Sequence, residues 1–293
     1  MEKSQKPAEE RACDLASIEA IRKAEADCVD LSFFRMDRQG AQCGFGLKGL
    51  CCRICHMGPC RITNKTPQGV CGADADTVVA RNFLREVAGG SAAHSDHARH
   101  LVLLLGKIGQ GKGGEYAIKD EPALRRIAKS YGIEEQGVPA RDLAVRLAEL
   151  MIGEFTSQEE PLKTLKLAPL SRQGVWQKRE IAPAGIDRMV VESMHRTHMG
   201  VDHDYRNVLL HVFRLALADG WGGSRIASQV SDILFGTPFP VRSTANLGIL
   251  REETVNVLVH GHEPALSEML AAASNDPEIK DYAKKAGAQG ITL

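Results

Sequence analysis

The residues best suited to chemistry in this sequence are cysteines gathered in one short stretch. Six of the eight cysteines fall within CGFGLKGLCCRICHMGPCRITNKTPQGVC, which spans residues 43–71. They are Cys43, Cys51, Cys52, Cys55, Cys60 and Cys71. A polynuclear metal cluster needs thiolates that converge on a small volume, and glycines let the backbone turn tightly around them. The stretch therefore favours iron–sulfur chemistry.

Three other uses of these cysteines fit less well. Disulfides are typical of secreted domains, and the polar N-terminus MEKSQKPAEERACDL lacks the apolar segment of a secretory signal. Structural zinc is the second candidate, but zinc sites commonly use two C-x2-C pairs and this stretch has one. A redox dithiol would need a thioredoxin-like strand that is absent here. Outside the stretch, we expect Cys28 to fill the core within an apolar helix stripe, whereas Cys13 has no motif to join.

Three histidines follow one another at three-residue steps. His94, His97 and His100 lie within a helical pattern, so each is displaced by about 4.5 Å along the helix from the one before. Imidazole titrates near neutral pH, so such a row could pass protons. Ordinary surface histidines are the competing interpretation.

A second histidine group and a glycine-rich segment fit chemistry less well. His195, His198 and His203 have metal-like spacing, but Arg196, Arg206 and nearby acids favour ion pairs there. The segment GKIGQGKGG at 106–114 nearly matches a phosphate-binding loop. It has glycine where the hydroxyl residue should stand and no helix directly behind it, so we expect a turn.

Composition excludes several classes of function. Lys and Arg number 37 and Asp and Glu also number 37, so the chain is formally neutral and offers no basic stripe for nucleic acid. The longest apolar run, LVLLLG at 101–106, is too short to span a bilayer. We expect a globular protein of the reducing cytoplasm.

Helical periodicity accounts for most of the chain up to about residue 236. We expect helices at 14–35, 73–104 with a break at Gly89-Gly90, 121–131, 140–155, 186–198, 205–219 and 223–234. Gly220 and Gly236 stand where C-terminal caps belong. Prolines at 238 and 240 mark a boundary between a helical domain at 1–238 and a second domain at 239–293.

The last part of the chain changes character. TVNVLVHGHEP at 254–264 predicts a strand, helices follow at 264–274 and 277–286, and GAQGITL predicts a second strand. The fold class is therefore mainly α, followed by the beginning of a Rossmann-like α/β domain. A parallel sheet needs cover on both faces, so we expect the sequence either to continue in a longer protein or to need a partner.

Together these segments resemble the catalytic subunit of anaerobic nickel–iron carbon monoxide dehydrogenases, from about residue 30 to residue 293. The resemblance rests on CGFGLKGLCCRICHMGPCRI, AAHSDHARH, MHRTHMGVDHDYRN, LADGWGGSRIASQVSDILFGTP and VNVLVHGHEPALSEM. It implies oxidation of CO with water to CO2, two protons and two electrons, or the reverse. It also implies a homodimer, a ferredoxin-like electron carrier and, in some members, an acetyl-CoA synthase partner.

The resemblance also implies roles for individual residues. Four cysteines would hold one 4Fe–4S cluster within the subunit, and two would share a second cluster with a twin subunit. The first set is Cys52, Cys55, Cys60 and Cys71, and the second is Cys43 and Cys51. His94 would act as the base beside a nickel–iron–sulfur cluster and His97 and His100 as its proton relay, although Leu103 stands where the family often has a further histidine. His262 would be a ligand of that cluster, with His260 as second choice; both end a predicted strand, where ligands bind in α/β sheets.

Further ligands of the family's active-site cluster come later in the chain. No cysteine follows Cys71, so we expect this sequence to be an N-terminal portion that is inactive by itself. One alternative is a truncated, non-catalytic electron-transfer module. Another is a relative of the hybrid-cluster proteins, against which the adjacent pair Cys51-Cys52 argues.

Overall fold

The computed structural model describes residues 6–158, 161–237, 250–259 and 264–293. His260 and His262 lie outside the described residues. The chain forms two compact units, one of Met1–Gln42 with Phe239–Leu293 and the other of Cys43–Pro238. Helices make up most of the described chain, as the sequence predicts, and none of them combines the length and apolar character that crossing a membrane requires.

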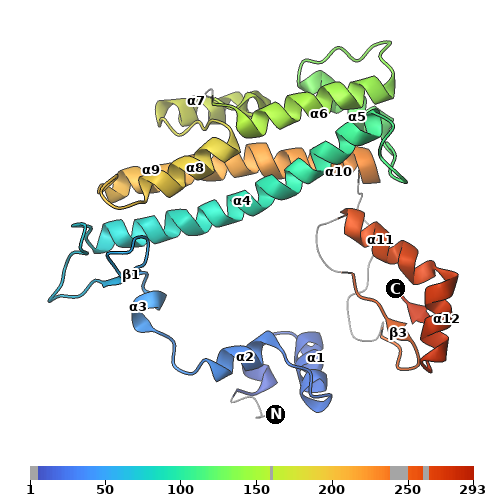
Figure 1. Ribbon diagram of the computed structural model, residues 1–293, viewed down its shortest axis with the longest axis horizontal. Helices are drawn as coiled ribbons and strands as arrows, with labels where there is room; N and C mark the ends of the chain where they lie inside the picture. The colour runs from blue at the N-terminus through green and yellow to red at the C-terminus, as the bar shows by residue number, and fades with distance from the viewer. Residues whose placement is uncertain (1–5, 159–160, 238–249, 260–263) are drawn as a thin grey trace. The chain divides into compact units, whose positions relative to one another are not determined.

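The long helix α4 (Ala75–Gly109) organises the unit of residues 43–238 (Figure 1). Asp74 caps its start by accepting a hydrogen bond from the Thr77 amide at 2.9 Å. Other helices pack along it: α6 (Ala140–Thr156), α8 (Ile186–Arg196), α9 (Tyr205–Ala218) and α10 (Arg225–Phe235). Apolar side chains at helical spacing meet in their shared core, which includes the fully buried Leu84, Leu105, Leu143, Leu147 and Met151.

The predicted break at Gly89-Gly90 is wrong, because α4 continues through both residues. Both glycines are exposed, and a Cβ at either position would meet nothing within 4 Å. Packing of the apolar stripe on both sides, at Leu84 and at Leu101, outweighs the low helix propensity of glycine. Gly109 is different: a Cβ there would lie 2.6 Å from the Arg141 carbonyl oxygen, so the close approach of α4 to α6 requires glycine.

The turn that joins α9 to α10 is a short π-helix, η3 (Asp219–Ser224). The predicted helix end at Gly220 is therefore wrong, since the chain passes through the wider turn directly into α10. Gly222 and Gly223 pack tightly there: a Cβ on Gly222 would lie 2.9 Å from Ile186 Cδ1. Gly236 does end α10, with φ of 90°, as predicted.

Smaller elements complete this unit. They are α3 (Gly44–Leu47), β1 (Cys51–Cys52), β2 (Cys60–Arg61), α5 (Glu121–Ser130), η2 (Lys163–Leu167) and α7 (Leu170–Lys178). Strands β1 and β2 form an antiparallel pair. The glycine-rich segment at 106–114 resembles a phosphate-binding loop only in sequence and forms a turn, as expected. Residues 106–109 end α4, and the next helix begins only at Glu121.

The N-terminal segment contains η1 (Ala8–Glu10), α1 (Leu15–Ala26) and α2 (Ser32–Arg38). The sequence predicted one helix at 14–35 with Cys28 in its core, and both points are wrong. Helix α1 ends at Ala26, Cys28 takes φ of 58°, and the Val29 amide closes the helix end on the Ala24 carbonyl at 2.8 Å. This left-handed turn leaves Cys28 exposed.

The C-terminal segment has the predicted strand–helix–strand order. It consists of β3 (Val255–Asn256), α11 (Pro264–Asn275), α12 (Pro277–Lys285) and β4 (Ile291–Thr292). The two strands are parallel, and Val255 is opposite Ile291. A parallel pair joined by helices is one crossover unit of an α/β sheet.

Candidate functional site

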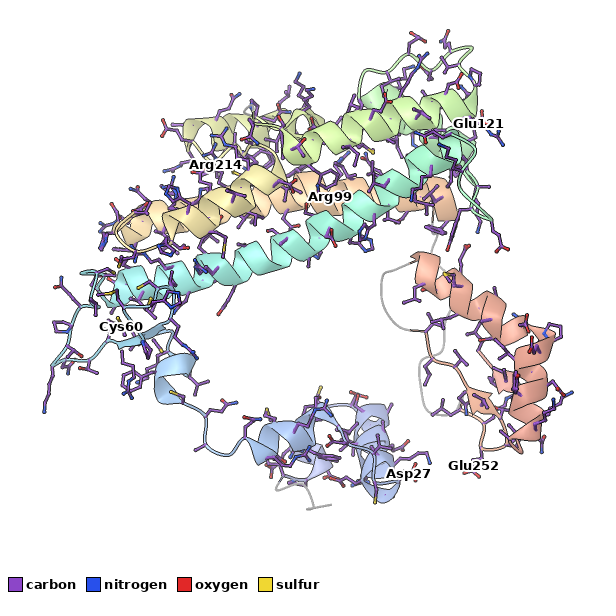
Figure 2. All side chains as sticks on the ribbon, viewed as in Figure 1. Asp27, Cys60, Arg99, Glu121, Arg214 and Glu252 are labelled. Carbon is purple, nitrogen blue, oxygen red and sulfur yellow. The ribbon has the colours of Figure 1, made fainter. Side chains whose placement is uncertain are left out.

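Five cysteines are half-buried, and four of them, Cys52, Cys55, Cys60 and Cys71, belong to the hairpin and the segment that lead into α4. Cys52 on β1 lies opposite Cys60 on β2, Cys55 lies in the turn between the strands, and Cys71 lies just before α4. Figure 2 shows Cys60 beside the first turns of that helix. Gly69 approaches closely, since a Cβ there would lie 3.5 Å from Cys60 Sγ. Tight backbone turns thus bring the hairpin and the segment before α4 together at one end of the helix.

The hairpin is fixed to α4 by side-chain and apolar contacts. The Asn82 amide donates hydrogen bonds of 3.0 Å to the carbonyl oxygens of Gly49 and Cys51. Beneath the hairpin, Ile62, Ala73 and Val78 form a small buried cluster against which Cys52 and Cys71 pack. The sulfurs are therefore held on a rigid base, as a metal centre requires.

The donor chemistry of the sulfur set suits an iron–sulfur cluster. All eight cysteines are free of disulfides. Within the ranges the structure describes, no three His, Cys, Asp or Glu side chains gather tightly enough to hold one metal ion. Four thiolates are the ligand set of a 4Fe–4S cluster, and zinc can also take four.

A buried cation lies against one of these cysteines, Cys71. Arg81 on α4 is only 1% exposed, and its Nη1 atom lies 3.8 Å from Cys71 Sγ. A positive charge beside the sulfurs favours a group that carries net negative charge, which a cluster on four thiolates does.

Cys43 and Cys51 differ from the other four in position. Cys43 is exposed at the start of α3, where the amides of Gly46 and Phe45, and then the charge of Arg61, lower the pKa of its thiol. Cys51 directly precedes Cys52 on β1, and successive strand residues point to opposite faces. The remaining pair, Cys13 and Cys28, is exposed in the N-terminal segment and lies in the other unit.

Of the three predicted catalytic histidines, His94 is hydrogen-bonded to side chains from a distant turn of the chain. Its Nδ1 atom lies 2.9 Å and 3.1 Å from the two carboxylate oxygens of Asp219, and 3.4 Å from Ser224 Oγ. Both partners belong to the π turn η3. An ionised carboxylate only accepts hydrogen bonds, so Nδ1 must donate and Nε2 is left as the ring atom that accepts a proton. Sequence reasoning missed Asp219 and Ser224; the only signal was the unusual DGWGGS segment that forms the turn.

His97 and His100 lie on α4 after His94, as predicted, at three-residue steps. His97 is half-buried, whereas His100 is exposed, with its Nε2 atom 3.9 Å from Asp96 Oδ1 one turn earlier. Leu103, at the next step, is 46% exposed. The relay role of these histidines stays a prediction.

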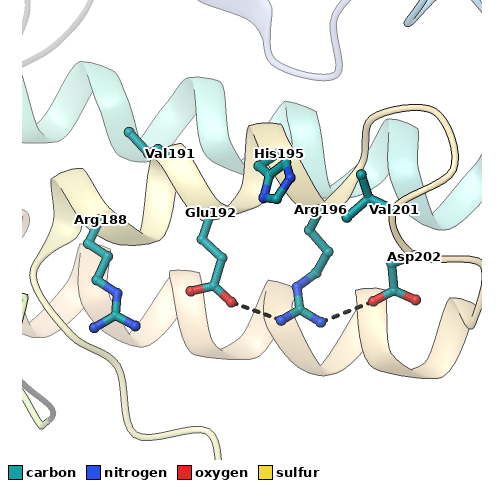
Figure 3. Close-up of a pocket in the computed structure, with 7 residues that line it drawn as sticks. All are labelled: Arg188, Val191, Glu192, His195, Arg196, Val201 and Asp202. Atoms are coloured by element: carbon teal, nitrogen blue, oxygen red, sulfur yellow. Dashed lines mark hydrogen bonds and ion pairs between the residues drawn. The ribbon is translucent and has the colours of Figure 1, made fainter.

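Ion pairs organise the region of His195, as the sequence predicts. Figure 3 shows Arg196 between Glu192 and Asp202, at 2.8 Å and 3.0 Å. These side chains line a cavity of about 640 Å³ together with Arg188, Val191, His195 and Val201. His211 is buried with its Nδ1 atom 3.7 Å from Glu192 Oε1, and burial holds the pKa of His211 below its usual value. Of the three histidines with metal-like spacing, only His195 lines this cavity.

Comparison with known proteins gives a consistent result. The sequence model of the Prismane/CO dehydrogenase family matches residues 50–293. Carbon monoxide dehydrogenase 1 of Methanosarcina acetivorans is 50% identical over 287 residues, which cover 97% of this chain and 46% of that protein. The chain thus spans about half the length of the curated relatives it matches.

Solved structures show the same similarity. The nickel-free carbon monoxide dehydrogenase from Thermococcus sp. AM4 is 45% identical with a TM-score of 0.91, covering 99% of this chain and 47% of that one. An acetyl-CoA synthase/carbon monoxide dehydrogenase with nickel-containing clusters is 37% identical with a TM-score of 0.88, covering 100% of this chain and 44% of that one.

Proposed function

The chain belongs to the Prismane/CO dehydrogenase family, and from that premise we propose that it supplies the electron-transfer clusters and the proton-accepting histidine of an enzyme that oxidises CO. The reaction is CO + H2O to CO2, two protons and two electrons. The chain spans about half the length of its relatives, and in this proposal residues outside this sequence would supply the remaining parts of the active site.

The observation that carries this proposal is the group of half-buried thiols at the start of α4. Cys52, Cys55, Cys60 and Cys71 would hold a 4Fe–4S cluster, which takes up and passes on single electrons. Cys43 and Cys51 would provide two of the four ligands of a second cluster, and a second copy of the chain would provide the other two. An exposed Cys43 whose pKa is lowered suits a ligand shared across a homodimer.

The proton path of this proposal begins at His94. Asp219 holds Nδ1, so Nε2 can accept a proton released when water and CO combine, and the carboxylate then stabilises the imidazolium. His97 and His100 would carry protons away along α4. When bound, the nickel–iron–sulfur group supplies Lewis acidity and accepts the electrons. His262 would ligate that group.

A ferredoxin-like carrier is the proposed electron acceptor. An acetyl-CoA synthase is a further proposed partner, supported by the structural relative in which the two enzymes are combined.

Metal analysis of the anaerobically purified chain tests the cluster assignment. After reconstitution with iron and sulfide we expect about six irons per chain, from one 4Fe–4S cluster and half of a shared one. Cys52→Ser should lose about four of them, whereas Cys13→Ser, which alters an exposed cysteine of the other unit, should lose none. Stoichiometric zinc in place of iron would overturn the proposal.

Activity of the enzyme in its full length tests the rest. CO-dependent reduction of a viologen dye should require both the cysteines and His94. A full-length His94→Ala variant that retains its clusters and its full rate would show that the base lies elsewhere.

A further inference from the structure

Arg81 is a buried cation near the start of α4. Its side chain is 1% exposed, so it is buried, and its Nε atom has no hydrogen-bond partner. Nη2 donates to the carbonyl oxygen of Asp202, and Nη1 faces Cys71 Sγ at 3.8 Å. Among the described residues Arg81 has neutral partners but no carboxylate.

Two acids beside the partners of Arg81, Asp202 itself and Asp74 three residues after Cys71, are engaged with other groups. The Asp202 carboxylate pairs with Arg196 at 3.0 Å, and the Asp74 carboxylate caps α4 through the Thr77 amide. A guanidinium removed from water without a negative partner is strongly unfavourable, and arginine does not lose its proton to escape that cost. The structure therefore needs a negative charge next to Arg81, on the side of Cys71.

Four thiolates around a 4Fe–4S core carry a net negative charge. We propose that Arg81 is the buried counter-charge of the cluster on Cys52, Cys55, Cys60 and Cys71, that it donates a hydrogen bond to the Cys71 sulfur, and that it raises the reduction potential of that cluster. This inference rests on the proposed function, because it takes the four cysteines to be cluster ligands.

The direction of the effect follows from charge. Reduction adds one electron to the cluster and makes it more negative, and a fixed cation at hydrogen-bond distance stabilises that form more than the oxidised one. Hydrogen bonds to the ligand sulfur act in the same direction, since they remove electron density from the cluster. Arg81 would thus tune electron transfer without touching the substrate.

An EPR-monitored redox titration of the anaerobically purified, cluster-loaded protein tests this. At a fixed potential, Arg81→Met should lower the ratio of reduced to oxidised cluster at least tenfold, which is 59 mV for a one-electron couple. Arg81→Lys keeps the charge and should stay within about threefold of the unsubstituted protein. Arg81→Gln removes the charge but keeps amide donors for the Asp202 carbonyl, so it should shift like the Met variant.

Arg85→Met is the matched control. Arg85 lies one turn further along α4 and donates to Thr197 Oγ1 at 2.9 Å. Its replacement removes an equal charge from the same helix and should leave the ratio unchanged. Equal ratios in Arg81→Met and in the unsubstituted protein would overturn the inference, and so would an equal shift in the Arg85 variant.

Two further outcomes separate a failure of the proposed function from a failure of the role of Arg81. If the unsubstituted protein gives no 4Fe–4S signal, the proposed function fails rather than the role of Arg81. If neither neutral variant loads a cluster, the unfolding stabilities of the iron-free variant and the iron-free parent decide whether Arg81 is only structural. We expect iron-free Arg81→Met to be at least as stable as the iron-free parent, because it no longer buries an unpaired charge. A less stable variant would give Arg81 a purely structural role and overturn the inference.

Discussion

The Nδ1 atom of His94 lies 2.9 Å from Oδ1 of Asp219, although 125 residues separate them in the sequence. The two meet because the π turn η3 brings Asp219 and Ser224 against the middle of α4. π-Helical turns are rare and occur frequently at functional sites. Here the turn gives one histidine of a three-histidine row a defined orientation.

Asp219→Asn tests whether that orientation matters. An amide can donate to Nδ1 instead of accepting from it, which would move the ring proton to Nε2 and remove the proton acceptor. In the proposed CO-oxidising enzyme we expect CO oxidation to slow by about a hundredfold or more, the usual contribution of a general base. The Nε2 resonance of ¹⁵N-labelled His94 should change from an unprotonated to a protonated nitrogen.

Asp187→Asn is the control for that experiment. Asp187 also contacts α4, through Arg99 at 2.8 Å, but no bond of the described structure joins it to His94. Its replacement should leave the His94 tautomer as it is. An equal loss of rate in both variants, with no change at Nε2 in either, would contradict a specific role for Asp219.

Replacing glycines of α4 should have opposite effects at two positions. Gly109→Ala puts a methyl group 2.6 Å from the Arg141 carbonyl oxygen and 2.7 Å from Val145 Cγ2, so helix α6 must move. We expect the free energy of unfolding to fall by about 1–3 kcal/mol. Gly89→Ala meets nothing within 4 Å and should raise it by roughly 0.5–1 kcal/mol. Urea unfolding followed by circular dichroism measures both, and a destabilised Gly89 variant would contradict the continuous helix.

Glu154 predicts a dependence of stability on pH. It is buried on α6, and burial raises the pKa of its carboxyl group above the usual 4.5 despite a hydrogen bond of 3.1 Å from the Thr164 amide. Between the unfolded and the raised folded pKa, the native state binds more protons, so this group's contribution to stability falls as pH rises. Glu154→Gln does not titrate.

The measurable quantity is the difference in unfolding free energy between Glu154→Gln and the parent protein. It should grow in favour of the variant as pH rises from 4.5 towards neutrality. Effects common to both proteins, including loss of metal in acid, cancel in the difference. A constant difference across this range would show that the carboxyl group titrates normally.

Cys43→Ser should separate the two proposed clusters. Serine replaces an exposed thiol whose pKa is lowered by backbone amides, and it binds iron poorly. We expect about two irons per chain to be lost and about four retained, together with weaker dimerisation in sedimentation experiments. Loss of about four irons, as expected for Cys52→Ser, would instead place Cys43 in the same cluster as Cys52.

Much of the helical unit was predictable because its signals are local. Apolar periodicity located α5 and α6 to within a residue or so, and Gly236 ended α10 as expected. The cysteine spacing similarly identified the hairpin region, since the requirement for convergent sulfurs is visible in the sequence itself. Short elements such as β1 and α3 were missed because they are shorter than any periodic pattern.

The errors arose where distant packing or a single residue's conformation decides. Gly89 looks like a helix breaker until the packing on both sides of it is known. Cys28 fits an apolar stripe, but a left-handed turn removes it from α1. Asp219 could not be paired with His94 from the sequence, because that contact depends on how α9 meets α4. Such long-range relationships are fixed by tertiary packing, which local propensity does not contain.

The adjacency of Cys51 and Cys52 on β1 has a consequence for the speed of electron flow. With each thiolate bound to its own cluster, as proposed, the two centres are joined by an unbroken covalent route of side chain, one peptide group and side chain. Tunnelling through bonds is far less attenuated than tunnelling across van der Waals gaps. Electrons would then pass between the clusters through the backbone of the hairpin. An insertion between these two residues would slow electron transfer even if both clusters still assembled.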